Sequence, residues 1–234
     1  MSIKFITFGS HDNYIDAGNR IIQQAKELNI FTETILYTPD YLKNDTVCWN
    51  MHSEFIKKNK RGYGYWLWKP FIIKKTMEKM NDGDILLYLD SGVELNCNRK
   101  NNLLKYINLV KTDKLIGSCT AIEKYWNKMD LIAKLDMNKP EYLNTPQRQG
   151  GLNLFCVCKE IRALVNEWYD LCCDYHNIDD TPSKLPNLDG FREHRHDQSV
   201  FSLLVKKYNL GGKYGINDAI YNLRNRSGIS KLKV

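Results

Sequence analysis

The segment NDGDILLYLDSGVEL, residues 81–95, decides the fold class of this 234-residue chain. Residues 85–89 (ILLYL) form a nearly continuous apolar run, which predicts a strand buried on both faces, as in a parallel sheet. The run ends at Asp90-Ser91-Gly92. These are ordinary turn residues, but ligands of open α/β sheets bind beyond the carboxyl ends of the strands. The tripeptide alone therefore leaves both a turn and a ligand site open.

Strand and helix patterns alternate on both sides of this segment, which predicts one α/β domain with an open, mostly parallel sheet flanked by helices. The expected strands cover residues 4–8, 32–37, 85–89, 115–120 and 152–158. The expected helices cover residues 14–28, 70–80, 160–175 and 198–207, and a further helix ends at 54–58. The polar stretch 177–189 predicts a surface loop that could close as a lid, and the basic tail at 222–234 is expected to fray.

Composition excludes some classes of protein. Lys and Arg number 34 against 27 Asp and Glu, a mild excess that fits phosphate-bearing ligands better than a dedicated nucleic-acid binder. No secretory signal and no apolar run of about 18 residues is present, so we expect a soluble, cytoplasmic protein. The seven cysteines form no paired CxxC motifs and are expected to be reduced.

Residues 61–70, RGYGYWLWKP, place four aromatic side chains between two cations. In an extended segment, alternation would put Trp66 and Trp68 on the same side. Aromatic faces stack on bases or on the C–H faces of sugars, and Arg61 and Lys69 suit phosphate. A role in core packing stays open beside a role as a ligand wall, and the two are compatible.

Residues 191–199, FREHRHDQS, precede an apolar helix. Asp197 suits a helix cap, although the capping-box partner is absent. His194 and His196 have HxH spacing, but the chain does not complete the HxHxDH pattern of metallo-hydrolases, which disfavours zinc hydrolysis.

Residues 147–151, QRQGG, end in tandem glycines, which fit either a turn or a close approach of the backbone to another group. The sequence contains no GxGxxG, Walker A, GxSxG or HExxH motif. These absences disfavour dinucleotide-binding, ATP-hydrolysing, serine-esterase and zincin functions.

Taken in order, the motifs resemble a group of bacterial and large-virus glycosyltransferases with the GT-A fold, in which RGYGYWxWKP, a strand-end D-x-G and HRHDQS recur together. The resemblance spans about residues 3–208. It implies a single GT-A-like (Rossmann-like) domain over residues 1–234, with a donor half at about 1–120, an acceptor half at about 121–222 and a basic tail at 223–234.

The same resemblance implies transfer of a sugar from a nucleotide-diphosphate sugar, most often UDP-linked, to a glycan or glycoprotein acceptor. Nucleic acid and a membrane span are not expected. The alternative is a non-catalytic protein that binds nucleotide sugars or glycans on a degenerate transferase scaffold, because one expected carboxylate is missing. The donor site is expected to contain Thr7, Phe8, Gly9, Arg61, Trp66, Trp68, Lys69, Asp90, Ser91 and Gly92.

Three residues are expected near the acceptor: Gln147, His196 and Asp197. Asp197 would take the proton of the acceptor hydroxyl if the anomeric centre inverts, and would orient the acceptor if the centre is retained.

Asp90 stands where the resemblance implies the first Asp of a D-x-D motif for Mn²⁺ or Mg²⁺, and Gly92 replaces the second. Either a further metal ligand comes from Glu94, His194 or His196, or Lys69 and Arg61 act in place of the metal.

Overall fold

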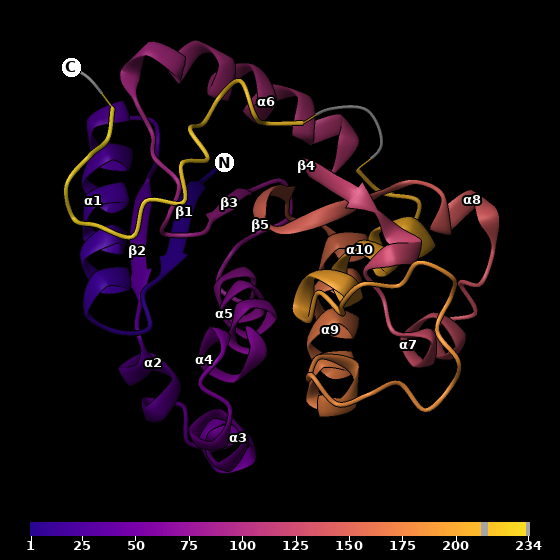
Figure 1. The fold of residues 1–234 in the computed structure, drawn as a ribbon. Coiled ribbons are helices and arrows are strands. Elements are labelled where there is room, and N and C mark those ends of the chain that lie inside the picture. The colour runs from indigo at the N-terminus through magenta and orange to yellow at the C-terminus, as the bar shows by residue number, and fades with distance from the viewer. Residues whose placement is uncertain (212–214, 233–234) are drawn as a thin grey trace.

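The computed structural model describes residues 1–211 and 215–232. Its strands are β1 (Ile3–Phe8), β2 (Glu33–Tyr37), β3 (Ile85–Leu89), β4 (Leu115–Ile122) and β5 (Pro146–Cys156). They form one sheet in the order β2-β1-β3-β5-β4 (Figure 1). β1, β2 and β3 run parallel, β5 runs against β3, and β4 runs against β5, so only β5 opposes the common direction. The expected open, mostly parallel sheet is confirmed.

Helices cover both faces of the sheet. α1 and α6 pack on one face, and α5, α9 and α10 pack on the other (Figure 1). The helices are α1 (Asp12–Leu28), α2 (Pro39–Asn44), α3 (Thr46–Lys58), α4 (Gly62–Tyr65), α5 (Trp68–Met77), α6 (Lys100–Asp113), α7 (Met129–Lys134), α8 (Pro140–Leu143), α9 (Lys159–Cys173) and α10 (Asp197–Lys207). Short 3₁₀ turns lie at Cys97–Arg99, Glu123–Tyr125 and Tyr175–Asn177. Within the described residues no helix has the length and apolar character that crossing a membrane requires.

Alternation along β3 decides where Asp90 points. Leu86 and Tyr88 belong to the hydrophobic cluster around α5, α9 and α10, whereas Leu87 and Leu89 belong to the cluster around α1 and α6. Side chains two residues apart in a strand share a face, so Asp90 continues on the side of α5 and α10. In agreement, the Tyr88 hydroxyl donates to Asp90 Oδ1 at 2.7 Å.

Residues 147–151 lie inside β5, so the interpretation of QRQGG as a turn is wrong. β5 starts at Pro146, six residues before the expected start at 152, and pairs with both β3 and β4. Pairing with β4, where Cys119 lies opposite Arg148, and the hydrogen bond from the Asp90 N–H to the Gly151 carbonyl hold this polar stretch extended, although its composition is that of a turn.

Residues 61–67 form a left-handed turn that leads into α5, so the alternation considered for an extended segment does not apply. Every residue from 62 to 66 has a positive φ, between 51° and 84°. Left-handed backbone costs about 1–2 kcal/mol for each residue other than glycine. Gly62 and Gly64 adopt it readily, and the Trp68 indole N–H donates to the Gly62 carbonyl at 2.9 Å, which closes the turn.

A substitution of Gly62 tests how far this turn depends on a residue without a side chain. Gly62 has φ +58°, and a Cβ there would overlap the Trp66 ring, whereas Gly83 has φ +88° and a Cβ there would meet nothing within 4 Å. We expect Gly83→Ala to lower the free energy of unfolding by about 1–2 kcal/mol through backbone strain alone. Gly62→Ala should lower it by more, because the indole must also move. Urea unfolding of both variants measures the difference, and equal losses would contradict this explanation.

Candidate functional site

A cleft of about 400 Å³ opens where β1 and β3 end. Asp90, which follows β3, lines it together with Phe8 of β1 and Gly151 of β5. Trp66 and Trp68 of the left-handed turn also line the cleft, and the Trp68 ring stacks on Phe8 with centroids 3.8 Å apart. The cleft therefore lies at the carboxyl edge of the parallel strands, the position expected for a ligand site.

A buried lysine joins two carboxylates beneath this cleft. Lys69 Nζ lies 3.4 Å from Asp90 Oδ1 and 3.2 Å from Asp197 Oδ2. The side chains of Lys69 and Asp197 are each 4% exposed, whereas that of Asp90 is 47% exposed. One cation, delivered by the first turn of α5, thus fixes the end of β3 to the start of α10. Of the two carboxylates, only that of Asp90 faces the cleft.

The charges of this unit follow from burial and pairing. Burial opposes the charge on Lys69, but the two carboxylates raise its pKa above the ordinary value. Burial raises the pKa of Asp197 to about 6; Lys69 opposes this rise and the charge on Asp90 adds to it. Burial, and then the neighbouring charge of Asp90, raise the pKa of the Tyr88 hydroxyl. Burial, and to a smaller degree the charge of Asp90, therefore outweigh the effect of Lys69 on the pKa of Asp197.

The tandem glycines of β5 make room for both carboxylates. A Cβ at Gly151 would overlap the Asp90 carboxylate, and a Cβ at Gly150 would lie 3.1 Å from Asp197 Oδ2. The backbone N–H of Asp90 also donates to the Gly151 carbonyl at 2.9 Å. The close backbone approach expected from QRQGG is confirmed, and the groups approached are the two aspartates.

The predicted donor residues divide into those that line the cleft and those that support it. The lining includes Phe8, Trp66, Trp68, Asp90, Ser91 and Gly92. Thr7 is fully buried in β1, and Gly9 packs against the backbone at the start of α1. Lys69 is buried next to the Asp90 carboxylate, and Arg61 pairs with Asp180 at 3.1 Å, away from the cleft lining.

The predicted acceptor residues lie behind the cleft surface. Asp197 and Gln147 are both buried and do not line it. Gln147 Oε1 accepts from Nε2 of Gln198, which does line the cleft, at 2.7 Å. His196 is buried, and its Nδ1 lies 2.7 Å from the Ile178 carbonyl, to which it donates. Asp197 and Gln147 thus reach the cleft only through Lys69 and Gln198.

Two of the predicted metal ligands are engaged elsewhere. Glu94 is fully buried and accepts hydrogen bonds from Gln24 and Asn225; burial opposes its ionisation, but the hydrogen bonds lower its pKa to about 2. His194 uses both ring nitrogens: Nδ1 accepts from the Lys128 N–H at 3.2 Å, and Nε2 contacts the Asn177 carbonyl at 2.7 Å.

The structure brings none of Glu94, His194 or His196 into the cleft with Asp90. Across residues 1–211 and 215–232, no three His, Cys, Asp or Glu side chains converge as metal ligands. Magnesium commonly binds through one or two carboxylates together with substrate phosphates. The contacts of Asp90 with Tyr88 and Lys69 both use Oδ1, so Oδ2 fits a metal shared with a ligand's phosphate oxygens, but not an ion held by the protein alone.

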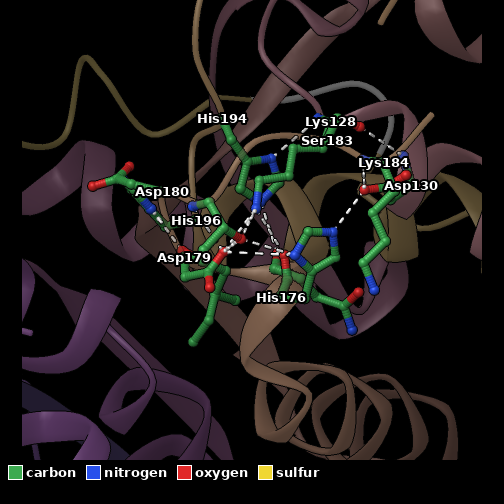
Figure 2. A network of polar contacts seen from close by, with 12 residues as sticks. Lys128, Asp130, His176, Asp179, Asp180, Ser183, Lys184, His194 and His196 are labelled. Carbon is green, nitrogen blue, oxygen red and sulfur yellow. Dashed lines mark hydrogen bonds and ion pairs between the residues drawn. The ribbon is translucent and has the colours of Figure 1, made fainter. Parts of the chain in front are cut away.

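The loop 177–189, expected at the surface, is tied down by the polar network of Figure 2. Lys128 Nζ donates to Asp179 Oδ1 at 2.8 Å and to the His176 carbonyl at 3.0 Å. Asp130 Oδ2 accepts from His176 Nε2 at 2.6 Å. Every residue of this loop is described, and none lines the cleft. The network fastens the segment that leads to α10 and so helps to place Asp197.

Sequence reasoning missed several residues of the site. Tyr88 could have been found, because alternation along β3 places it on the same side as Asp90. Arg224 and Arg226 also line the cleft, but the tail that carries them has no periodic pattern. The expectation that this tail frays is wrong for the part described, through residue 232, because buried Asn225 fixes it to the Gly92 carbonyl at 2.8 Å. Residues 233–234 lie outside the described part.

No protein-family model matches the chain, and no curated protein matches its sequence. Among solved structures, the chain is similar to mouse xyloside xylosyltransferase 1 in its apo form, with a TM-score of 0.46 and 12% sequence identity. The match covers 89% of this chain and 83% of that chain. A likeness of this degree identifies neither a donor nor an acceptor.

The raised pKa of Asp197 predicts how stability depends on pH. An acid whose pKa is about 6 when folded and about 4 when unfolded loses stabilisation as pH rises between these values, because folding then disfavours its ionised form. Between pH 5 and pH 7, we expect wild type to lose about 1 kcal/mol of unfolding free energy relative to Asp197→Asn. Urea titrations at both pH values measure this difference.

Glu160→Gln is the control for this experiment. A hydrogen bond from Lys114 is the largest of the interactions that lower the pKa of Glu160 to about 2. Glu160 is therefore ionised in both folded and unfolded chains from pH 5 to pH 7, and its substitution should cost the same at both pH values. A pH-independent effect of Asp197→Asn as well would contradict the assignment of a raised pKa.

Proposed function

We propose that this chain is a glycosyltransferase of the GT-A type whose donor is a nucleotide-diphosphate sugar, with UDP as the first nucleotide to test. The observation that carries the proposal is the composition of the cleft: one exposed carboxylate, an aromatic wall and free cations at the strand ends. Lys60, Arg224 and Arg226 line the cleft and make no side-chain ion pair or hydrogen bond within the described residues. Cations suit a diphosphate, and aromatic faces suit a base or a sugar.

Glycosyl transfer places specific demands on such a cleft. The bond between the anomeric carbon and the diphosphate oxygen breaks while the acceptor oxygen bonds to that carbon, so negative charge grows on the diphosphate. The acceptor hydroxyl releases its proton in this step, and the departing diphosphate can take it up. Guanidinium groups positioned in advance stabilise that charge. Asp90 would hold Mn²⁺ or Mg²⁺ if the donor brings one, and such an ion would supply further positive charge there.

We assign Asp90 to the reacting ligands and Asp197 to a positioning role. Asp90 is half exposed and faces the cleft, whereas Asp197 is buried and pairs with Lys69. Burial keeps Asp197 from direct contact with an acceptor hydroxyl, so the expected role of a general base does not suit it. Through Lys69, Asp197 instead holds Asp90 in place.

A screen of nucleotide sugars tests the proposal. The panel contains UDP-, GDP- and CMP-linked sugars, and each is tested once with Mn²⁺ and once with a chelator. A true donor raises the melting temperature, because it binds the folded state only, and slowly releases its nucleotide when no acceptor is present. A donor that binds without transfer or hydrolysis would favour the non-catalytic alternative. Failure of every nucleotide and nucleotide sugar to bind at millimolar concentration would overturn the proposal.

Substitution of Asp90 tests its assignment. We expect Asp90→Ala to lower the rate of donor turnover by about 10²–10³, equivalent to about 3–4 kcal/mol of transition-state stabilisation. Asp180→Ala is the matched control, because Asp180 is also ion-paired and similarly exposed, 45% against 47%, but lies outside the cleft lining. Turnover of the labelled donor, followed by chromatography, measures both. Near-normal turnover by Asp90→Ala would remove Asp90 from the site.

A further inference from the structure

We infer that residues 222–226, here called the strap, form the diphosphate-binding side of the cleft and supply its cationic groups through Arg224 and Arg226. This inference rests on the proposed function, since it names the part of that site which holds the leaving group. Figure 1 shows the C-terminal chain, in yellow, running from the region of α6 toward α1. The sequence marks this part of the chain only as a basic tail, and no motif assigned it a role.

Alternation along the strap directs its side chains. Asn222, Arg224 and Arg226 line the cleft, whereas Asn225 between the two arginines is 1% exposed. Both arginines are exposed at the surface of the cleft. One buried residue therefore fixes the segment, and the residues on either side of it present guanidinium groups to a ligand.

The anchor of the strap is the loop that also carries Asp90. The Asn225 N–H donates to the Gly92 carbonyl at 2.8 Å, and Asn225 Nδ2 donates to Glu94 Oε1 at 2.7 Å. Buried Arg20 joins the two segments from α1, because it donates to the carbonyls of Ser91 at 2.8 Å and of Asn225 at 3.2 Å. The strap and the end of β3 are thus held together as one unit, in which the buried Glu94 carboxylate accepts a hydrogen bond from Asn225.

The identity of Gly92 follows from this contact. A Cβ at Gly92 would lie 3.2 Å from Arg224 Cα and 3.3 Å from its carbonyl carbon, closer than ordinary van der Waals contact. The position at which a second Asp was expected therefore faces the backbone of the strap. Glycine there lets a cation-bearing segment approach the strand end, where a larger side chain would push it away.

The chemistry of the strap fits a diphosphate. Arg224 makes no ion pair or hydrogen bond through its guanidinium within residues 1–211 and 215–232, and Arg226 contacts only the Tyr14 ring, 5.4 Å from its centroid. Arg224 also holds a left-handed backbone, with φ +49°. Two neighbouring guanidinium forks match the oxygens of a phosphate group. The same cleft lining includes the aromatic side chains of Tyr63 and Trp66, which suit the base or the sugar of the donor.

The test compares binding of inorganic pyrophosphate, UDP and uridine by titration calorimetry, with Mn²⁺ and with a chelator. We expect the double variant Arg224→Ala/Arg226→Ala to bind pyrophosphate and UDP about 10- to 100-fold more weakly, from the usual strength of hydrogen bonds to charged groups. Uridine binding should not change. Arg192→Ala is the matched control, because Arg192 is an exposed arginine outside the cleft lining. This variant should bind all three ligands as wild type does.

A second variant, Gly92→Val, keeps both arginines but forces the strap away from the strand end, and it should weaken pyrophosphate binding as well. Arg224→Lys/Arg226→Lys should recover part of the affinity, because the charge remains. If wild type binds UDP and the double alanine variant binds it equally well, the strap assignment is overturned and the proposed function stands. If wild type binds neither pyrophosphate nor UDP, the strap assignment is overturned and a UDP-linked donor is excluded with it.

Discussion

The ion pairs of Lys69 are the constraint on which the rest of the site depends. One buried ammonium group links three elements that are distant in sequence: α5, the end of β3 and the start of α10. Removing one partner from a buried ion pair such as Lys69–Asp197 typically costs about 3–5 kcal/mol, because the remaining charge is left uncompensated. Lys69 thereby holds Asp197 in place, and its second contact orients Asp90, the carboxylate that reaches the cleft.

The neighbouring backbone is shaped to let this arrangement form. The left-handed turn at residues 62–66 delivers Trp68 and Lys69 to the cleft at the start of α5. Gly151 brings β5 against the Asp90 carboxylate, and Gly92 brings the strap against the strand end. Strained or closely approached backbone of this kind persists where the surrounding structure holds it, and it concentrates at functional sites.

Much of the fold was predictable because it depends on local patterns. The apolar run 85–89 and the helical spacing of residues 14–28 identify β3 and α1 directly. The position of Asp90 at a cleft was predictable, since ligands of open α/β sheets bind beyond the carboxyl ends of the strands. The left-handed turn at residues 62–66 was not predictable, because a sequence of glycines and aromatic residues fits an extended segment equally well.

Contacts between distant segments were beyond local patterns. Lys69 suits a phosphate ligand as well as it suits a buried ion pair, and only the fold brings Asp197 next to it. Gly92 was interpreted as a missing metal ligand, because nothing in the sequence indicated that the C-terminal tail packs on it. In both cases the residue type was informative, but its partner is set by packing between elements far apart in the chain.

We propose that the cleft above Asp90 receives the diphosphate of a sugar donor. A crystal structure of the chain with UDP bound measures this directly. We expect the diphosphate within hydrogen-bonding distance of Arg224 and Arg226, and on the same side of the cleft as Asp90. A diphosphate bound elsewhere, with the cleft filled only by solvent, would contradict the claim.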